Sequence, residues 1–213
     1  MTVKPILAVV DYGSGNLRSA AKAFEHEARG RADIVVTNDA DAVRKADRIV
    51  LPGQGAFGDC AAGLRAVPGM VEALEEAVLK RAVPFLGICV GMQLLATTGY
   101  EHGTHAGLGW LGGEVRKMEP ADPSLKLPQL GWNALEFKAH PLLAGWPQGA
   151  HVYFANSYHY APAEPASAIA HADYGGRIVA AVAKGNIAGT QFHPEKSQAI
   201  GLKLVSNFLD WRP

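Results

Sequence analysis

The first 95 residues alternate short apolar runs with segments of helical periodicity, and this alternation restricts the fold more than any other feature. The apolar runs, each typical of a short strand in a buried sheet, are residues 5–10, 34–37, 48–51 and 85–88. The segments with helical character are residues 16–28, 40–46, 56–66 and 69–81. This order predicts an α/β fold with an open, largely parallel twisted sheet and helices on both faces.

Residues 100–190 follow a different pattern, rich in glycine, proline and short strand-like runs. Those runs are residues 113–118, 133–137, 151–153, 167–171 and 178–183. We expect antiparallel additions and loops at one edge of the sheet rather than a separate domain. An apolar stripe predicts a closing helix that begins at Ser197. With 213 residues, no internal repeat and no low-complexity linker, residues 1–213 are predicted to form a single domain.

Composition argues against several classes of function. The formal net charge is zero, and we find neither a basic stripe for nucleic acid nor a basic amphipathic helix for a membrane surface. No apolar stretch approaches the ~20 residues of a membrane span, and the N-terminus does not resemble a signal peptide. Two cysteines, Cys60 and Cys89, make no disulfide framework. We therefore expect a cytoplasmic protein with reduced thiols.

Cys89 stands where the fourth strand turns into a helix, between Gly87 and Gly91. Flanking glycines let the two segments cross tightly, as in a nucleophile elbow that exposes a side chain at the end of a strand. A helix from Val90 onward directs its N-terminus at the sulfur, which favours a thiolate. A buried structural cysteine is the ordinary alternative. The glycines at this junction favour a nucleophile.

A cysteine nucleophile needs a base and a group that orients the base. His193 and Glu195 flank Pro194, and in an extended segment their side chains face the same side. The carboxylate of Glu195 then reaches one imidazole nitrogen while the other nitrogen faces Cys89. The tripeptide alone is a modest signal, but beside an elbow cysteine it predicts a catalytic triad.

An oxyanion hole is the third requirement of this chemistry. The N–H of Val90, at the helix start, is one natural donor. The loop that follows the third strand contains Gly53, Gln54 and Gly55 after Pro52, and its glycines permit the backbone conformations of a second donor. Taken alone, an ordinary strand-to-helix turn explains these glycines equally well.

Two further patterns are weak. The loop of residues 11–16 contains Gly13 and Gly15 but lacks the third glycine and the lysine of nucleotide-binding motifs, so a plain turn is favoured. His102 and His105 have no third ligand nearby. The sequence therefore predicts no metal site and no cofactor.

Residues 87–93 together with residues 193–195 resemble the triad motifs of class I glutamine amidotransferases. Other stretches resemble one branch of this family, the glutaminase subunits of imidazole glycerol phosphate synthases. They are residues 11–19, 51–59, 131–133, 153–154, 157–158 and 193–198. The likeness runs nearly end to end, and residues 11–19 and 193–198 are its most branch-specific parts.

The resemblance implies a glutaminase that converts L-glutamine to glutamate and ammonia with the triad Cys89, His193 and Glu195. It implies that Gly53, Gln54 and Val90 hold the oxyanion and that four residues bind glutamine: Gly55, Gln93, Ser157 and Tyr158. The ammonia is expected to enter a (β/α)₈-barrel cyclase subunit of a heterodimer, which makes imidazole glycerol phosphate and aminoimidazole carboxamide ribotide in histidine biosynthesis. The implied docking residues are Asn16, Trp132, Tyr153 and Lys196, with core packing as the alternative for each.

The sequence departs from the commonest pattern of this branch in three places. Gln54 replaces a frequent valine, Gln129-Leu130 replaces His-Met, and Asn156 replaces a histidine before Ser-Tyr. These changes concern gating and docking rather than the chemistry. Two other functions stay open: a stand-alone cysteine hydrolase of the same scaffold, such as a γ-glutamyl hydrolase or peptidase, and a catalytically silent regulatory subunit.

Overall fold

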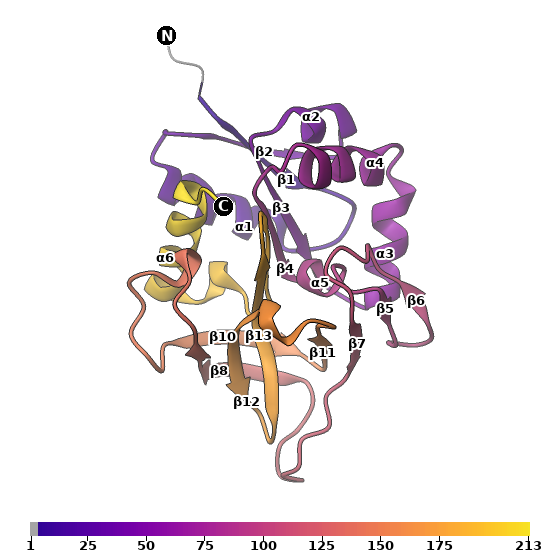
Figure 1. The fold of residues 1–213 in the computed structure, drawn as a ribbon, viewed down its shortest axis with the longest axis vertical. Helices are drawn as coiled ribbons and strands as arrows, with labels where there is room; N and C mark the ends of the chain where they lie inside the picture. The colour runs from indigo at the N-terminus through magenta and orange to yellow at the C-terminus, as the bar shows by residue number, and fades with distance from the viewer. Residues whose placement is uncertain (1–3) are drawn as a thin grey trace.

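The computed structural model describes residues 4–213, and its centre is an eight-stranded sheet (Figure 1). In spatial order its strands are β2 (Asp33–Thr37), β1 (Ile6–Val10), β3 (Arg48–Gly53), β4 (Phe85–Cys89), β14 (Ile187–Thr190), β13 (Arg177–Lys184), β12 (Ala168–Asp173) and β9 (Glu136–Phe137). The strands from β2 to β14 pair in parallel, and those from β14 to β9 pair antiparallel. The predicted parallel sheet with an antiparallel extension is confirmed.

The burial of each strand explains its composition. Every residue of β3, β4 and β14 is buried, because neighbouring strands and helices cover them on all sides. Apart from Arg48 and Thr190 at the strand ends, their residues are apolar or glycine, with none of the alternation of a half-exposed strand. In contrast β2 forms the edge of the sheet, and its Val35 and Val36 are exposed.

Helices cover both faces of this sheet, as the sequence predicts. They are α1 (Leu17–Ala28), α2 (Ala40–Lys45), α3 (Phe57–Ala66), α4 (Met70–Glu75), α5 (Val90–Gln93) and α6 (Gln198–Asp210). Figure 1 shows α1 and α6 on one side of the central strands and α3 and α4 on the other. Short turns complete the helical segments: a π-helical turn η1 (Glu76–Lys80) and 3₁₀ turns η2 (Pro141–Leu143), η3 (Pro165–Ser167) and η4 (Pro194–Lys196).

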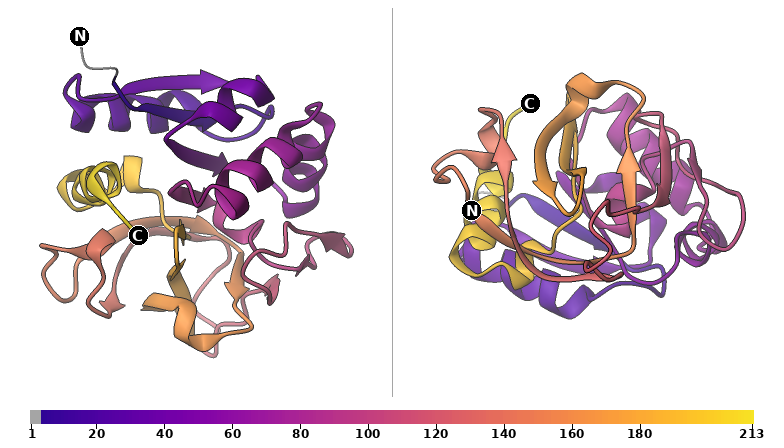
Figure 2. Two further views of the ribbon diagram at one scale, coloured as in Figure 1. Left: turned by 45° about the horizontal axis from the view of Figure 1, so that its top comes forward. Right: turned by 90° about the horizontal axis from the view of Figure 1, so that it is seen from below.

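Two smaller sheets lie outside the central one. One pairs β8 (Gln129–Ala134) with β10 (His151–Asn156); the other contains β11 (Tyr158–Ala161), β7 (Glu114–Lys117), β5 (Thr98–Gly99) and β6 (His105–Ala106). Figure 2 shows these pink and orange segments gathered beside the indigo and magenta half of the chain. The expectation that all later strands extend one edge is therefore too simple. The run at 133–137, for example, is divided at Leu135 between two sheets.

The helix expected after Cys89 is much shorter than its apolar spacing suggests. It ends at Gln93, and Leu94 and Leu95 instead occupy a buried turn. The carbonyl groups of Leu94 and Leu95 accept hydrogen bonds from the N–H groups of Leu108 and Leu111, at 2.7 and 3.1 Å. These loop contacts replace the next helical turn. Within residues 4–213, no helix combines the length and the apolar character that crossing a bilayer requires.

Candidate active site

The backbone at Cys89 has the strained geometry of an elbow. Cys89 adopts φ 56° and ψ −113°, an unfavourable conformation for a residue with a side chain, at the junction of β4 and α5. In the sheet it lies opposite Gly53, so the carboxyl ends of β3 and β4 meet at this point. The sharp turn places the thiol at the edge of the sheet where ligand sites of open α/β folds are found.

Close packing around the elbow requires both flanking glycines. A Cβ atom on Gly91 would lie 1.8 Å from the carbonyl oxygen of Leu51, and one on Gly87 would lie 2.4 Å from the carbonyl oxygen of Gly91. Neither backbone group has room to move, because α5 crosses directly over the ends of β3 and β4. The glycines therefore act as the sequence pattern indicates, by letting the helix approach the strands.

His193 and Glu195 form a buried pair beside the elbow. Nδ1 of His193 lies 2.9 Å from Oε1 of Glu195, and the side chains are 5% and 4% exposed. The connecting segment is not extended as expected; Pro194 begins the 3₁₀ turn η4, because its fixed φ suits a first helical position. Ser197 secures the segment: its hydroxyl donates to the carbonyl of His193 at 2.7 Å and accepts from the N–H of Tyr153 at 3.0 Å.

The surroundings of His193 favour its protonated form. Burial alone opposes the charge, but the neighbouring Cys89 and Glu195 side chains outweigh it and raise the pKa of His193 to about 9. An imidazolium at neutral pH is the form that can donate a proton to a leaving group. Because Nδ1 contacts Glu195, the other ring nitrogen, Nε2, is available for proton transfer.

Gln191 is a site residue that the sequence analysis missed. It is fully buried, and its Nε2 lies 3.6 Å from Sγ of Cys89 as a hydrogen-bond donor. Its Oε1 accepts a hydrogen bond from Nε2 of Gln93 at 2.9 Å, which leaves the Gln191 amide nitrogen facing the sulfur. The signal was a polar residue directly after an apolar strand and two positions before His193.

A cavity of about 240 Å³ opens in front of the sulfur. Its lining includes Cys89, His193 and most residues expected in the glutamine and oxyanion sites: Gln54, Gly55, Val90, Gln93, Ser157 and Tyr158. Gly53 lies beneath this surface and is buried. Glu101, Pro128, Ala155 and Asn156 also line the cavity and were not predicted as site residues. Glu101 has one carboxylate oxygen bound to the N–H of Phe57 at 2.8 Å.

The two expected oxyanion donors differ in availability. The N–H of Val90 belongs to the first turn of α5, where backbone donors have no partner within the helix. The N–H of Gln54 donates to Oγ of Ser14 at 3.3 Å, and this hydroxyl donates to the carbonyl of Gln54 at 2.5 Å. Ser14 thus holds the Gln54 peptide in the conformation that the structure shows.

Three of the four expected docking residues form a row of contacts. The rings of Trp132 and Tyr153 pack edge to face with centroids 6.0 Å apart, and Nζ of Lys196 lies 5.8 Å from the centre of the Tyr153 ring. Trp132 is 47% exposed and Leu130, two positions earlier on β8, is 68% exposed. Alternate residues of a strand share a face, so an apolar surface adjoins the site. Asn16 stands before α1, partly buried.

No metal-binding cluster of three or more His, Cys, Asp or Glu side chains was found between residues 4 and 213. His105 forms one strand residue of β6 and packs its ring close to Gly58 of α3. His102 lies in the preceding loop, where it adopts a positive φ of 56°.

Comparisons with known proteins agree with this geometry. The family model described as glutamine amidotransferase class-I matches residues 8–210. The chain is 59% identical to "Imidazole glycerol phosphate synthase subunit HisH" of Rhodospirillum rubrum and 58% identical to the protein of that name from Mesorhizobium japonicum, each over 97% of this chain and 99% of the relative. In fold it resembles the solved structure of PurLQS from Thermotoga maritima, with a TM-score of 0.67, 22% identity and coverage of 98% of this chain and 99% of that one.

Proposed function

The chain belongs to the class-I glutamine amidotransferase family, and from this premise we propose that it is the glutaminase subunit of an imidazole glycerol phosphate synthase in histidine biosynthesis. The buried pair of His193 and Glu195 beside the elbow thiol of Cys89 is the observation that carries the chemistry. The sequence identity to named synthase subunits, which extends over almost the full length, supports the assignment to this synthase.

In the first half-reaction the thiolate of Cys89 attacks the side-chain carboxamide carbon of L-glutamine, and a C–S bond forms. The N–H of Val90 stabilises the resulting oxyanion. The imidazolium of His193 gives its proton to the amide nitrogen as the C–N bond breaks and ammonia leaves. A γ-glutamyl thioester stays on Cys89, and Glu195 keeps the imidazole ring in position throughout.

In the second half-reaction neutral His193 takes a proton from a water molecule that attacks the thioester carbon. The C–S bond breaks and glutamate is released, so glutamine and water yield glutamate and ammonia. The N–H of Gln54 supplies a second oxyanion donor only when it no longer donates to Ser14. We therefore place the control of activity at the Ser14–Gln54 contact, in the loop that follows Gly53 at the end of β3.

The cavity lining contains polar groups that suit glutamine. Gly55, Gln93, Ser157 and Tyr158 line it and bind the substrate in this proposal. Glu101 supplies a carboxylate for the α-ammonium group. Its Oε2 accepts a hydrogen bond from the N–H of Phe57, and its Oε1 is available to the substrate. In the same proposal, Gln191 is a positioning residue whose amide stabilises the thiolate, as backbone and side-chain donors do for other anions.

The partner is a (β/α)₈-barrel cyclase subunit, which receives the ammonia and makes imidazole glycerol phosphate and aminoimidazole carboxamide ribotide. The exposed Leu130 and Trp132, with Tyr153 and Lys196, form the docking surface in this proposal, because exposed aromatic residues beside an active site are typical of interface cores. We further propose a single domain over residues 1–213 and a cytoplasmic location, in keeping with a biosynthetic role. A stand-alone hydrolase would have no partner to cover this exposed apolar surface.

The deciding experiment measures glutamate release from glutamine with and without the cognate cyclase subunit and its nucleotide ligand. Strong activity only in the assembled, ligand-bound complex supports the synthase subunit, whereas equal activity of the chain alone indicates an independent hydrolase. Cys89→Ala should abolish release while folding and complex formation persist. Unchanged activity in this variant would refute the site.

Labelling with a glutamine-analogue electrophile adds a matched control. The wild-type chain and Cys60→Ala should each take up one label, and Cys89→Ala none. Cys60 is the other cysteine of the chain; it is also buried and does not line the substrate cavity. Because its thiol contacts Ser14 and the carbonyl of Gln54, this variant is compared by the number of labels and not by the rate of labelling. Absence of labelling of the wild-type chain in the assembled complex would support the silent regulatory subunit instead.

A further inference from the structure

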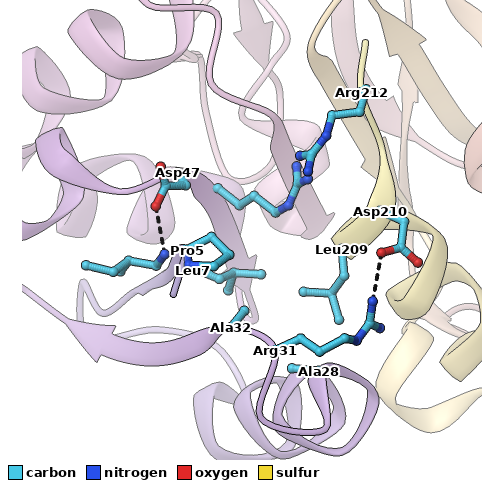
Figure 3. A pocket seen from close by; sticks show the side chains of 11 residues that line it. Pro5, Leu7, Ala28, Arg31, Ala32, Asp47, Leu209, Asp210 and Arg212 are labelled. Carbon is cyan, nitrogen blue, oxygen red and sulfur yellow. Dashed lines mark hydrogen bonds and ion pairs between the residues drawn. The ribbon is translucent and has the colours of Figure 1, made fainter. Parts of the chain in front are cut away.

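A second cavity, of about 410 Å³, lies at the opposite end of the sheet from Cys89 (Figure 3). The amino ends of β1 and β3 and the carboxyl ends of α1 and α6 surround it, with Leu7, Ala28, Ala32 and Leu209 as apolar lining. Arg48 begins the strand that Gly53 ends beside the elbow. Five steps of about 3.3 Å along that strand put roughly 17 Å between the two ends.

Three arginines line this cavity: Arg31, Arg48 and Arg212. Arg48 is only 5% exposed, and its Nη1 is buried without a hydrogen-bond partner among the described residues. Its guanidinium carbon lies 5.9 Å from the centre of the Phe208 ring. This cation–π contact stabilises the positive charge less than an ion pair with an anion would. Burial, and next the charge of Arg212, lower the pKa of Arg48. An unpaired buried cation is unfavourable by itself.

The acidic residues of the cavity are already engaged elsewhere. Asp47 accepts a hydrogen bond from the N–H of Ile6 at 2.8 Å, and Asp210 pairs with Arg31 at 3.0 Å. Figure 3 shows both contacts and shows Arg212 reaching into the same cavity. Across residues 4–213, neither Arg48 nor Arg212 takes part in an ion pair with a carboxylate. Arg48 and Arg212 are therefore close enough to repel one another without an ion pair to a carboxylate, although the charges of Asp210 and Asp47 act on Arg48 from farther away.

We propose that this cavity binds a phosphate monoester, with its phosphate group between Arg48 and Arg212 and its organic part against the apolar lining. Guanidinium groups bind phosphate oxygens in a bidentate manner, and they tolerate burial better than ammonium groups. Three arginines against two aspartates leave one net positive charge in the cavity, which favours binding of an anion. The volume falls in the range of about 300–1,000 Å³ for small-molecule sites and exceeds what inorganic phosphate needs.

Helix termini provide the competing explanation for these arginines, because cations are favourable near the carboxyl ends of helices. Arg31 fits that explanation, since its Nη2 donates to the carbonyl of Glu27 near the end of α1 at 3.3 Å. Arg48 does not, because no carbonyl group within residues 4–213 accepts a hydrogen bond from its side chain. A site for an external anion explains Arg48 where helix capping does not.

The proposed site does not depend on the proposed function. Trp132, Tyr153 and Lys196 lie with the substrate cavity at the other end of the sheet, so docking there leaves the second cavity open. A phosphate ester can thus bind the chain alone or in a complex.

The test uses the full chain and follows backbone amide chemical shifts during titration with inorganic phosphate and with glycerol 3-phosphate at constant ionic strength. We expect saturable shifts at residues 31–32, 47–48 and 209–212, with glycerol 3-phosphate binding more tightly than inorganic phosphate. Arg212→Met should weaken binding at least about tenfold, in line with the loss of one charge-assisted contact. Arg48→Met should weaken it further.

Two controls separate this site from other positive surfaces. Arg116→Met removes an exposed arginine of β7 and should leave the affinity unchanged. Lys196→Met removes the lysine that lines the substrate cavity and should also leave the affinity unchanged. Shifts confined to residues near Cys89, or equal affinity in Arg212→Met and the wild type, would overturn the proposal. Tighter binding of succinate than of glycerol 3-phosphate would overturn the phosphate assignment. If Arg48→Met does not fold, Arg212→Met decides alone.

Discussion

The role of Gln191 can be tested by replacing it with leucine, which has a similar size but no amide. The change removes the donor 3.6 Å from the sulfur of Cys89 and the acceptor 2.9 Å from Nε2 of Gln93. A hydrogen bond to a charged group contributes about 1.5–3 kcal/mol. At about 1.4 kcal/mol per factor of ten, loss of the contact to the thiolate predicts a decrease of about 10- to 150-fold in kcat/KM.

Steady-state glutamate release by the assembled synthase measures this effect. The rate of Cys89 alkylation at pH 7 measures the reactivity of the sulfur independently of substrate binding. Gln191→Glu retains the acceptor for Gln93 but removes the donor, so it should be at least as slow in alkylation as Gln191→Leu. Gln129→Leu is the matched control: that glutamine is also buried, and neither of its amide atoms has a partner within the described chain. Alkylation and turnover within twofold of the wild type in Gln191→Leu would refute the reasoning.

Three further outcomes follow from the geometry of the elbow, the triad and the exposed strand. Gly91→Ala should lower the free energy of unfolding in urea by about 3 kcal/mol or more, because its Cβ would meet a backbone carbonyl at 1.8 Å, whereas Gly63→Ala, with a nearest contact of 3.0 Å, should be far milder. Glutamate release should decline as pH rises through about 9, where His193 loses its proton, and Glu195→Gln should move this decline to lower pH because it removes an attraction that raises the pKa. A lack of any such shift would contradict the pairing. Trp132→Ala should weaken cyclase binding, measured by calorimetry, by about 30-fold while leaving the thermal unfolding midpoint unchanged.

The parallel half of the fold was predictable because its strands, except β2 at the edge, are almost entirely buried. A continuous apolar run such as Ile6–Val10 has few alternatives once helical segments separate it from the next run. Several later strands are short or partly exposed, and pairings such as β8 with β10 and β11 with β7 join strands that are not consecutive in the sequence. β14 illustrates the difficulty: its four residues include a glycine and a threonine, yet it lies in the middle of the sheet between β4 and β13. Its burial comes from its neighbours rather than from its own periodicity.

In the site, local motifs were readable and long-range contacts were not. Gly87 and Gly91 each stand two positions from Cys89, and His193 stands two positions from Glu195. These short spacings were enough to indicate the local geometry. Gln191 contacts Cys89 across 102 positions and was missed. Ser14, which holds Gln54 across 40 positions, was missed for the same reason. The 3₁₀ turn at Pro194 was also misjudged as extended, although the side chains meet as expected.

The short α5 changes how the thiolate must be stabilised. A four-residue helix has few aligned peptide dipoles, so its N-terminus offers the sulfur less than a full helix would. The stabilising groups must then come from β14 and the segment after it, which supply Gln191 and His193. The register pairs Gly189 with Gly87 and Thr190 with Ile88, so Gln191 follows directly beside Cys89. A Cβ on Gly189 would lie 2.5 Å from the side chain of Met92 on α5. The close pairing of β4 and β14 under α5 is therefore what brings the amide and the imidazole to the nucleophile, and reactivity depends on sheet register as much as on the triad itself.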